Sequence, residues 1–287
     1  MSNYRGSPLG IKLIMTLHDT FGYSAAKGVV FIVALFYALV SNKNRKALSS
    51  YYEAVGEPNT FKSYFKHVYA FSLAIFDRFI AKEGMQEKVI EVERLNVEAF
   101  ESLQKSGGIL ILSHHGNWAQ SFKIFQTYDV KLNITGNEAI NADIQRLETD
   151  KEHNERIHVI NLQEGMQAML EIARALQNKE IIIIMVDRVQ ELEKSVAVDF
   201  LGRPTFFHSG AFEIAQMRKA PILGCDIVRT GDNRIKVEFS DIITSKKKAK
   251  QEAISDLAQQ YADFLTQVVR QYPYQWFNFF DFWEKRP

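Results

Sequence analysis

Residues 107–120 read GGILILSHHGNWAQ and join a short apolar run to two histidines, a glycine and an asparagine. The apolar run 109–112 predicts a buried strand, and a helix is expected to begin near Asn117. Titratable groups are costly to bury in a core, so they are expected where the strand emerges into solvent. The stretch therefore indicates an active-site turn at the end of a strand.

The chain around this turn alternates between strand and helix from about residue 88 onward. In the segment 180–186, EIIIIMV, every residue after Glu180 is apolar, as a parallel strand covered on both faces requires. The residues TGDN, 230–233, predict a hairpin turn between the last two strands. We predict an α/β fold, a mostly parallel sheet flanked by helices, preceded by helices over 48–81. The further expected strands cover 131–135, 157–160, 222–228 and 234–239, and the further helices 164–178, 210–218 and 246–271.

The composition is that of an ordinary globular protein, with 287 residues, 46% hydrophobic and 24% charged. The formal net charge of +1 gives no reason to expect nucleic-acid binding. Cys225 is the only cysteine, which excludes an internal disulfide and a cysteine-rich zinc site. Its apolar neighbours predict a buried structural thiol. We expect no cleavable signal peptide at the polar start.

Residues 9–46 raise the question of a membrane. The uncharged piece 28–41 holds about a dozen apolar residues, fewer than the roughly 20 that a spanning helix needs. The basic cluster NKNRK, 42–46, follows it and suits anionic headgroups. We predict an anchor lying in the membrane interface over 1–47 and a separate domain over 48–287. The alternative is an ordinary buried helix.

Two strands are expected to end in polar groups at the same edge of the sheet, one at His114 and the other at Asp187 and Arg188. A loop over 200–210, before a helix, could present backbone N–H groups to an anion. Its candidate residues are Gly202, Arg203, Ser209 and Gly210. Adjacent histidines in a strand point to opposite faces, so we predict no metal site. The nucleophile-elbow pattern G-x-S-x-G and a P-loop are both absent from the sequence.

At this point the sequence resembles a known family. SHHGNWA is similar to the S-H-x-G-N-W-E segment of the late lipid A acyltransferases, a branch of the lysophospholipid acyltransferase superfamily with a glycerol-3-phosphate acyltransferase-like fold. Residues 185–223 look like the Asp-Gln segment of that family, its F-F-G-x-P turn and the helix after it. Residues 270–287 resemble its Tyr-Pro-x-Gln-Trp terminus, and residues 9–37 its membrane-associated start.

The resemblance implies that the domain over 48–287 transfers a fatty acyl chain from an acyl carrier protein thioester, or acyl-CoA, to a hydroxyl of a membrane lipid or glycolipid. The family's catalytic pair has the spacing His-x4-Asp/Glu, and its histidine, the general base, corresponds to His114. Asp187 and Arg188 are candidates for organising the site or stabilising an oxyanion. Substrate contacts are implied for Asn117, which is also a plausible helix N-cap, and for Trp118, Gly202, Arg203, Ser209 and Gly210. Arg203 could bind the carrier's phosphopantetheine or pair with an acidic neighbour.

The resemblance also implies that the protein is located at the cytoplasmic face of the inner membrane and contacts the membrane surface through residues 9–46. We expect no cofactor, no metal and no nucleic-acid partner. The sequence departs from the family at Ala119, which occupies the position of the acid in the His-x4-Asp/Glu motif. If the motif is instead counted from His115, the position of the acid falls on Gln120. The chain could be an acid-deleted variant, a carboxylate such as Asp187 could substitute, or the protein could bind acyl chains without transferring them. A hydrolase that releases acyl groups to water is a weaker rival.

A second departure concerns the terminus, where residues 276–283 read WFNFFDFW in place of the family's arginines. Basic side chains suit a phosphorylated acceptor. Their replacement predicts a less anionic acceptor, unless these aromatic residues simply pack against the core or sit at the membrane interface.

Overall fold

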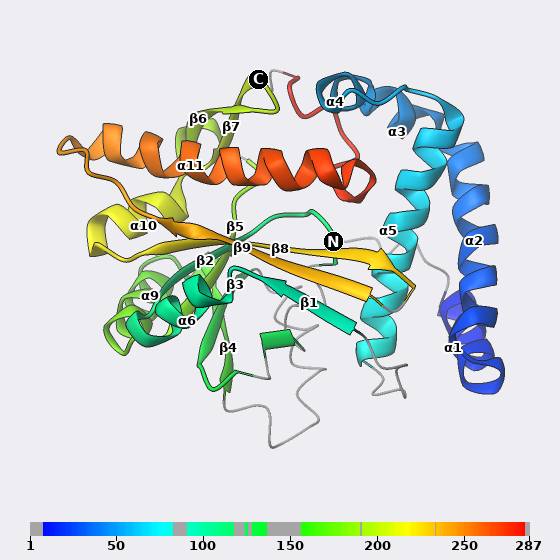
Figure 1. The fold of residues 1–287 in the computed structure, drawn as a ribbon, viewed down its shortest axis with the longest axis horizontal. Coiled ribbons are helices and arrows are strands. Elements are labelled where there is room, and N and C mark those ends of the chain that lie inside the picture. Colours follow the sequence, from blue (N-terminus) through cyan, green and yellow to red (C-terminus); the bar gives the residue numbers. More distant parts are fainter. Residues whose placement is uncertain are drawn as a thin grey trace.

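The computed structural model describes residues 8–82, 91–117, 124–125, 128–136, 156–189, 191–232 and 234–284. Its centre is a seven-stranded sheet in the order β1-β9-β8-β2-β5-β3-β4, in which only the β8–β9 pair is antiparallel (Figure 1). The predicted α/β class with a mostly parallel sheet is confirmed. The strands are β1 Glu91–Leu95, β2 Gly108–Leu112, β3 Leu132–Gly136, β4 Ile157–Asn161, β5 Ile181–Met185, β8 Ile222–Gly231 and β9 Arg234–Ile243.

The central strands β2 and β5 are buried on both faces, which explains their continuously apolar sequences. Ile109 and Ile182 share one core cluster with the helices α9 Met166–Gln177, α10 Gly210–Arg218 and α11 Lys250–Gln271. Leu110 and Ile183, one residue further along each strand, lie in a second cluster with α6 Val97–Ser106. Cys225 is buried in that second cluster, as predicted.

Five helices precede the sheet, and α1, α2 and α5 stand together beside one end of it (Figure 1). Their bounds are α1 Pro8–Phe21, α2 Tyr23–Val40, α3 Asn42–Ala47, α4 Ser49–Val55 and α5 Phe61–Lys82. The predicted helical stretch 48–81 is divided because Gly56, with φ +76°, ends α4 in the left-handed conformation.

Helix α2 is longer than the dozen residues expected from the sequence. It has 18 residues, and by length and composition alone it could cross a membrane. Only 22% of it is buried, so it is not the ordinary buried helix that was the alternative. Ala26, Val30, Ala34 and Ala38 form its buried side.

A two-stranded antiparallel hairpin lies outside the main sheet and was not predicted. It pairs β6 Ser195–Phe200 with β7 Arg203–His208, so residues 200–210 do not form the single loop expected. Leu201 and Gly202 both have positive φ, 58° and 80°, as a two-residue hairpin turn requires. Three short 3-10 helices complete the described elements, η3 Leu162–Glu164, η4 Leu192–Lys194 and η5 Pro273–Gln275.

Candidate active site

The turn after β2 is held between β8 and the last part of the chain. Gly116 has φ +66°, and a Cβ there would lie 2.0 Å from the carbonyl oxygen of Ile227. Its N–H donates to the carbonyl of Gln275 at 2.7 Å, and the N–H of Asn117 donates to that of Ile227. Because only glycine fits this conformation and approach, the SHHGN sequence fixes the path of the turn.

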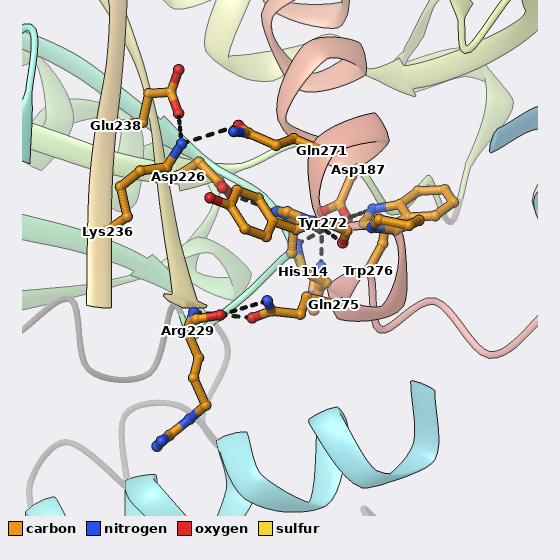
Figure 2. A network of polar contacts seen from close by, with 12 residues as sticks. His114, Asp187, Asp226, Arg229, Lys236, Glu238, Gln271, Tyr272, Gln275 and Trp276 are labelled. Carbon is orange, nitrogen blue, oxygen red and sulfur yellow. Dashed lines mark hydrogen bonds and ion pairs between the residues drawn. The ribbon is translucent and has the colours of Figure 1, made fainter. Parts of the chain in front are cut away.

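His114 and Asp187 meet at the ends of neighbouring parallel strands. The register pairs Leu112 with Met185, so the residues two positions further along also lie opposite each other. The His114 Nδ1 lies 2.8 Å from Asp187 Oδ1, and the His114 N–H donates to Asp187 Oδ2 at 2.9 Å (Figure 2). The Asp187 side chain is fully buried, whereas that of His114 is 17% exposed. The predicted site residues of two separate segments are thus brought together.

The charge state of Asp187 determines how the His114 ring is protonated. Burial would raise the pKa of Asp187, but the charge and hydrogen bonds of His114 and the charge of Arg188 outweigh it and lower the pKa to about 2. An ionised carboxylate only accepts hydrogen bonds, so Nδ1 of His114 carries a hydrogen. In the neutral ring the basic lone pair is then on Nε2, as in a serine-protease triad.

Two side chains from the last part of the chain bind the second oxygen of Asp187. Asn278 Nδ2 donates to Oδ2 at 2.9 Å and Trp276 Nε1 donates at 3.2 Å. Both side chains are buried. Asp187 therefore has donors on each oxygen, which is what a buried carboxylate needs to remain ionised.

His115 points to a different carboxylate. Its Nδ1 lies 2.8 Å from Asp226 Oδ1 and its Nε2 lies 3.0 Å from the carbonyl oxygen of Tyr272. Burial lowers the pKa of His115, but the charge and hydrogen bonds of Asp226 and the Tyr272 carbonyl outweigh it and raise the pKa. Both partners are acceptors, so this geometry favours the doubly protonated ring. His115 thus makes a buried ion pair beside the His114–Asp187 pair.

The residues after α11 are fastened to the sheet at several points (Figure 2). The side chain of Gln275 brackets the backbone of Arg229, accepting from its N–H at 3.0 Å and donating to its carbonyl at 2.9 Å. Lys236 of β9 pairs with Glu238 at 2.6 Å and lies 5.0 Å from the centre of the Tyr272 ring. These contacts fix Tyr272 and Gln275 against β8 and β9.

Arg188 and Asn117 each make structural contacts. Arg188 donates to Asn278 Oδ1 at 2.8 Å and to the carbonyl of Phe277 at 3.1 Å. Asn117 donates to Asp77 of α5 at 2.7 Å, and Asp77 also pairs with Arg229. Asn117 thus ties the active-site turn to the helices before the sheet. Residues 118–123, at which the helix that Asn117 was expected to cap would begin, lie outside the described residues.

The four residues of the expected anion loop lie at the two ends of the β6–β7 hairpin. Gly202 and Arg203 belong to its turn, where Arg203 pairs with Glu53 at 2.9 Å, the acidic-neighbour alternative. Ser209 and Gly210 begin α10 next to the end of β5, because the His208 N–H donates to the carbonyl of Val186 at 2.9 Å. Five residues of extended strand, roughly 17 Å, separate the two pairs.

Trp118, Ala119 and Gln120 lie outside the described residues. Asp226, Trp276 and Asn278 were not among the residues expected at the site. The Tyr-Pro-x-Gln-Trp pattern at the terminus indicates only the family resemblance, and residues 276–283 suggest an acceptor contact, core packing or a place at the membrane interface. Among the described residues, no group of three or more His, Cys, Asp and Glu side chains is placed to hold a metal ion.

Comparison with known proteins bears on what this arrangement does. No curated protein matches the sequence. Residues 62–285 match the bacterial lipid A biosynthesis acyltransferase family over more than half of the chain, including both strands that end in the His114–Asp187 pair and the segment that holds it. The chain therefore belongs to the bacterial lipid A biosynthesis acyltransferase family.

Proposed function

We propose that the protein is an O-acyltransferase that moves a fatty acyl chain from an acyl carrier protein thioester, or acyl-CoA, to a hydroxyl of a membrane lipid or glycolipid. His114 is the general base, and Asp187 supplies the carboxylate that the position of Ala119 lacks. The observation that carries this proposal is the 2.8 Å contact between His114 Nδ1 and the buried Asp187.

The proposed reaction needs one base and one stabilising charge. An alcohol attacks a thioester at neutral pH only if a base takes its proton during the attack. His114 Nε2 takes that proton, the oxygen forms a bond to the carbonyl carbon, and the carbon–sulfur bond of the collapsing intermediate breaks. The imidazolium returns the proton to the leaving thiolate, giving a thiol and an ester. Asp187 holds the ring and stabilises its transient positive charge.

Arg188 has a supporting part in this scheme. Two of its N–H groups are directed to Asn278 and Phe277, so we assign it to organising the site rather than to binding the oxyanion. Ser209 and Gly210 follow the end of the hairpin that lies next to β5, and we keep them as candidates for contact with the acyl donor. Trp118 remains a candidate on the resemblance alone, as do Gly202 and Arg203 at the far turn.

We assign α2 and α3 to the membrane interface at the cytoplasmic face of the inner membrane. One side of α2 packs on α5, while the opposite side leaves large apolar side chains exposed, including Ile32 at 66% and Phe36 at 60%. The basic residues Lys43, Arg45 and Lys46 follow in α3. An apolar face beside basic residues is the composition of an interfacial anchor.

The acceptor is proposed to be less anionic than a lipid A precursor. Residues 276–278 are buried, so packing accounts for the first part of WFNFFDFW, while Asp281 further along accepts from Ser50 at 2.7 Å. No basic side chain lies within this stretch to bind a phosphate. Efficient acylation of a phosphorylated lipid A precursor by the purified protein would overturn this part of the proposal.

The experiment is consumption of acyl carrier protein thioester by the purified full chain in a native membrane lipid extract. The variants are His114→Ala and Ala119→Glu, with His158→Ala as the matched control, because His158 also contacts a carboxylate, Glu171, but is 62% exposed. Acylated lipid from the chain and from His158→Ala, with none from His114→Ala, supports the proposal.

Other outcomes point to the rival functions. Release of free fatty acid in place of acylated lipid indicates a hydrolase. Acylated lipid only from Ala119→Glu shows that Asp187 does not substitute for the acid. Binding of acyl chains without turnover in either form indicates a non-catalytic binding protein, which the alanine at position 119 motivates.

A further inference from the structure

We propose that Trp276 and Asn278 are positioning residues of the acyl transfer, because they hold Asp187 in the orientation and charge state in which it serves His114. This inference rests on the proposed function of the His114–Asp187 pair. It assigns a catalytic contribution to a segment whose sequence suggests an acceptor contact, aromatic packing or a place at the membrane interface.

The contacts of Asp187 divide cleanly between its two oxygens. Oδ1 faces the His114 ring, whereas Oδ2 accepts from the His114 N–H and from the two side chains of the last segment. The carboxylate is fully buried. A buried carboxylate that loses its donors either takes up a proton or binds its remaining cationic partner more strongly. The two side-chain donors therefore set how strongly Asp187 binds the imidazolium.

Each donor is itself fixed by its neighbours. Asn278 Oδ1 accepts from Arg188 at 2.8 Å, so its amide group is turned with Nδ2 toward Asp187. The carbonyl of Trp276 lies 2.7 Å from His67 Nε2, and burial lowers the pKa of His67 to about 4, which keeps that ring neutral. A carbonyl only accepts, so Nε2 of His67 is the donor.

The backbone of the same segment is paired with the catalytic turn. The N–H of Phe277 donates to the carbonyl of His114 at 2.8 Å, and an antiparallel bridge joins His115 to Trp276. The base, its carboxylate and the two donors thus share one rigid frame. The other charged or titratable groups acting on Asp187 are Arg188 beside it, His115 on the turn and Tyr261 of α11.

Two substitutions remove one donor each, and Asn278→Asp also keeps the shape of the side chain. Trp276→Phe deletes the indole N–H and leaves a ring in the aromatic packing. Asn278→Asp retains the acceptor for Arg188 but places a second carboxylate against Asp187. Both leave more uncompensated negative charge beside the imidazolium, which favours the protonated, inactive base. On the acid side of the pH profile we expect kcat to fall about tenfold, as for the loss of one hydrogen bond to a charged group.

The chain offers a matched control in Trp283. It lies in the same segment and its ring is 6.4 Å from that of Trp276, but its buried Nε1 has no hydrogen-bond partner among the described residues. Trp283→Phe makes the same chemical change without removing a donor from Asp187. We expect it to retain the kcat of the unchanged protein.

The measurement is kcat and KM for the acyl carrier protein thioester across pH, with thermal unfolding of every variant. The acid limb of kcat/KM should move to higher pH in Trp276→Phe and Asn278→Asp, with KM nearly constant, and stay in place in Trp283→Phe. A purely structural role would change stability or KM but leave the acid limb unmoved. If Asn278→Asp fails to fold, the two tryptophan variants decide the question by themselves.

The outcomes separate this inference from the proposed function. If His114→Ala is inactive while Trp276→Phe and Asn278→Asp keep kcat and the acid limb of the unchanged protein, the inference is wrong and the proposed function stands. If His114→Ala retains full activity, the proposed function is wrong and the inference falls with it.

Discussion

Asp187→Asn is the most informative change to the catalytic pair, because the two side chains have nearly the same shape. Three N–H groups converge on Oδ2, those of His114, Trp276 and Asn278, at 2.9–3.2 Å. An amide NH2 cannot face three donors, so the asparagine oxygen must take that side. Its NH2 group then faces His114 Nδ1 and makes that nitrogen an acceptor.

The substitution therefore forces the hydrogen of the imidazole onto Nε2, the atom that has to accept the proton of the alcohol. In a serine protease, the corresponding Asp-to-Asn change lowers kcat roughly ten thousandfold through the same change of tautomer. The equivalent barrier increase is about 5 kcal/mol. Here we expect a loss of roughly a thousandfold to ten thousandfold, because the constraint on the asparagine comes from three donors at once.

The assay is single-turnover transfer from a radiolabelled acyl carrier protein thioester to extracted membrane lipid. Asp199→Asn provides the control, because Asp199 is an exposed carboxylate on the hairpin strand β6 and its replacement should leave kcat unchanged. Thermal unfolding must confirm that Asp187→Asn is folded. A folded Asp187→Asn protein that keeps kcat within tenfold of the unchanged protein would refute the tautomer argument.

Three further predictions concern stability and the membrane. The pKa of the buried His115 is raised in the folded protein, so its protonation stabilises the fold. This stabilisation is complete below the unfolded pKa of about 6.5 and is lost as the pH rises through the folded pKa. The free energy of unfolding measured in urea should therefore fall above neutral pH, and it should fall less steeply in His115→Gln. Gly116→Ala should lower the free energy of unfolding, measured in urea, by about 1–3 kcal/mol or more. Gly165→Ala is the control, because Gly165 also has a positive φ but has nothing within 4 Å of an added Cβ. The double substitution Ile32→Glu and Phe36→Glu should weaken flotation of the protein with anionic phospholipid vesicles. Phe206→Glu is the control, because Phe206 is 47% exposed but does not belong to α2, and it should leave flotation unchanged. Equal flotation of the double variant and the unchanged protein would exclude α2 from the interface.

Strands with continuous apolar sequences could be predicted from the sequence because each of their side chains is hydrophobic and therefore expected to be buried. β5 lies within one residue of its expected bounds, and α10, which mixes apolar and charged residues, also has its expected bounds. β1, EVERL, was missed because three of its five residues are charged, as an edge strand tolerates. The β6–β7 hairpin was missed because its turn residues and Pro204 suggested a loop.

The candidate site depends on contacts that local sequence patterns do not encode. Asp187 could be named as a substitute acid because it follows a strand, but its meeting with His114 depends on the register of β2 and β5. Asp226 lies 111 residues from its partner His115, and Asn278 lies 91 residues from Asp187. Such pairs are determined only once the order of strands in the sheet is known.

The segment that supplies Trp276 and Asn278 also bears on when the protein becomes competent during its synthesis. Residues 276–278 leave the ribosome after all strands of the sheet, so a nascent chain can bring His114 and Asp187 together before both donors to Oδ2 exist. A chain that ended before residue 276 would contain the apolar face of α2, His114 and Asp187, but it would lack the two side chains that donate hydrogen bonds to Asp187 Oδ2. On the proposed function, acyl transfer becomes possible only once residues 276–278 have been made, later than the helices that we assign to the membrane interface.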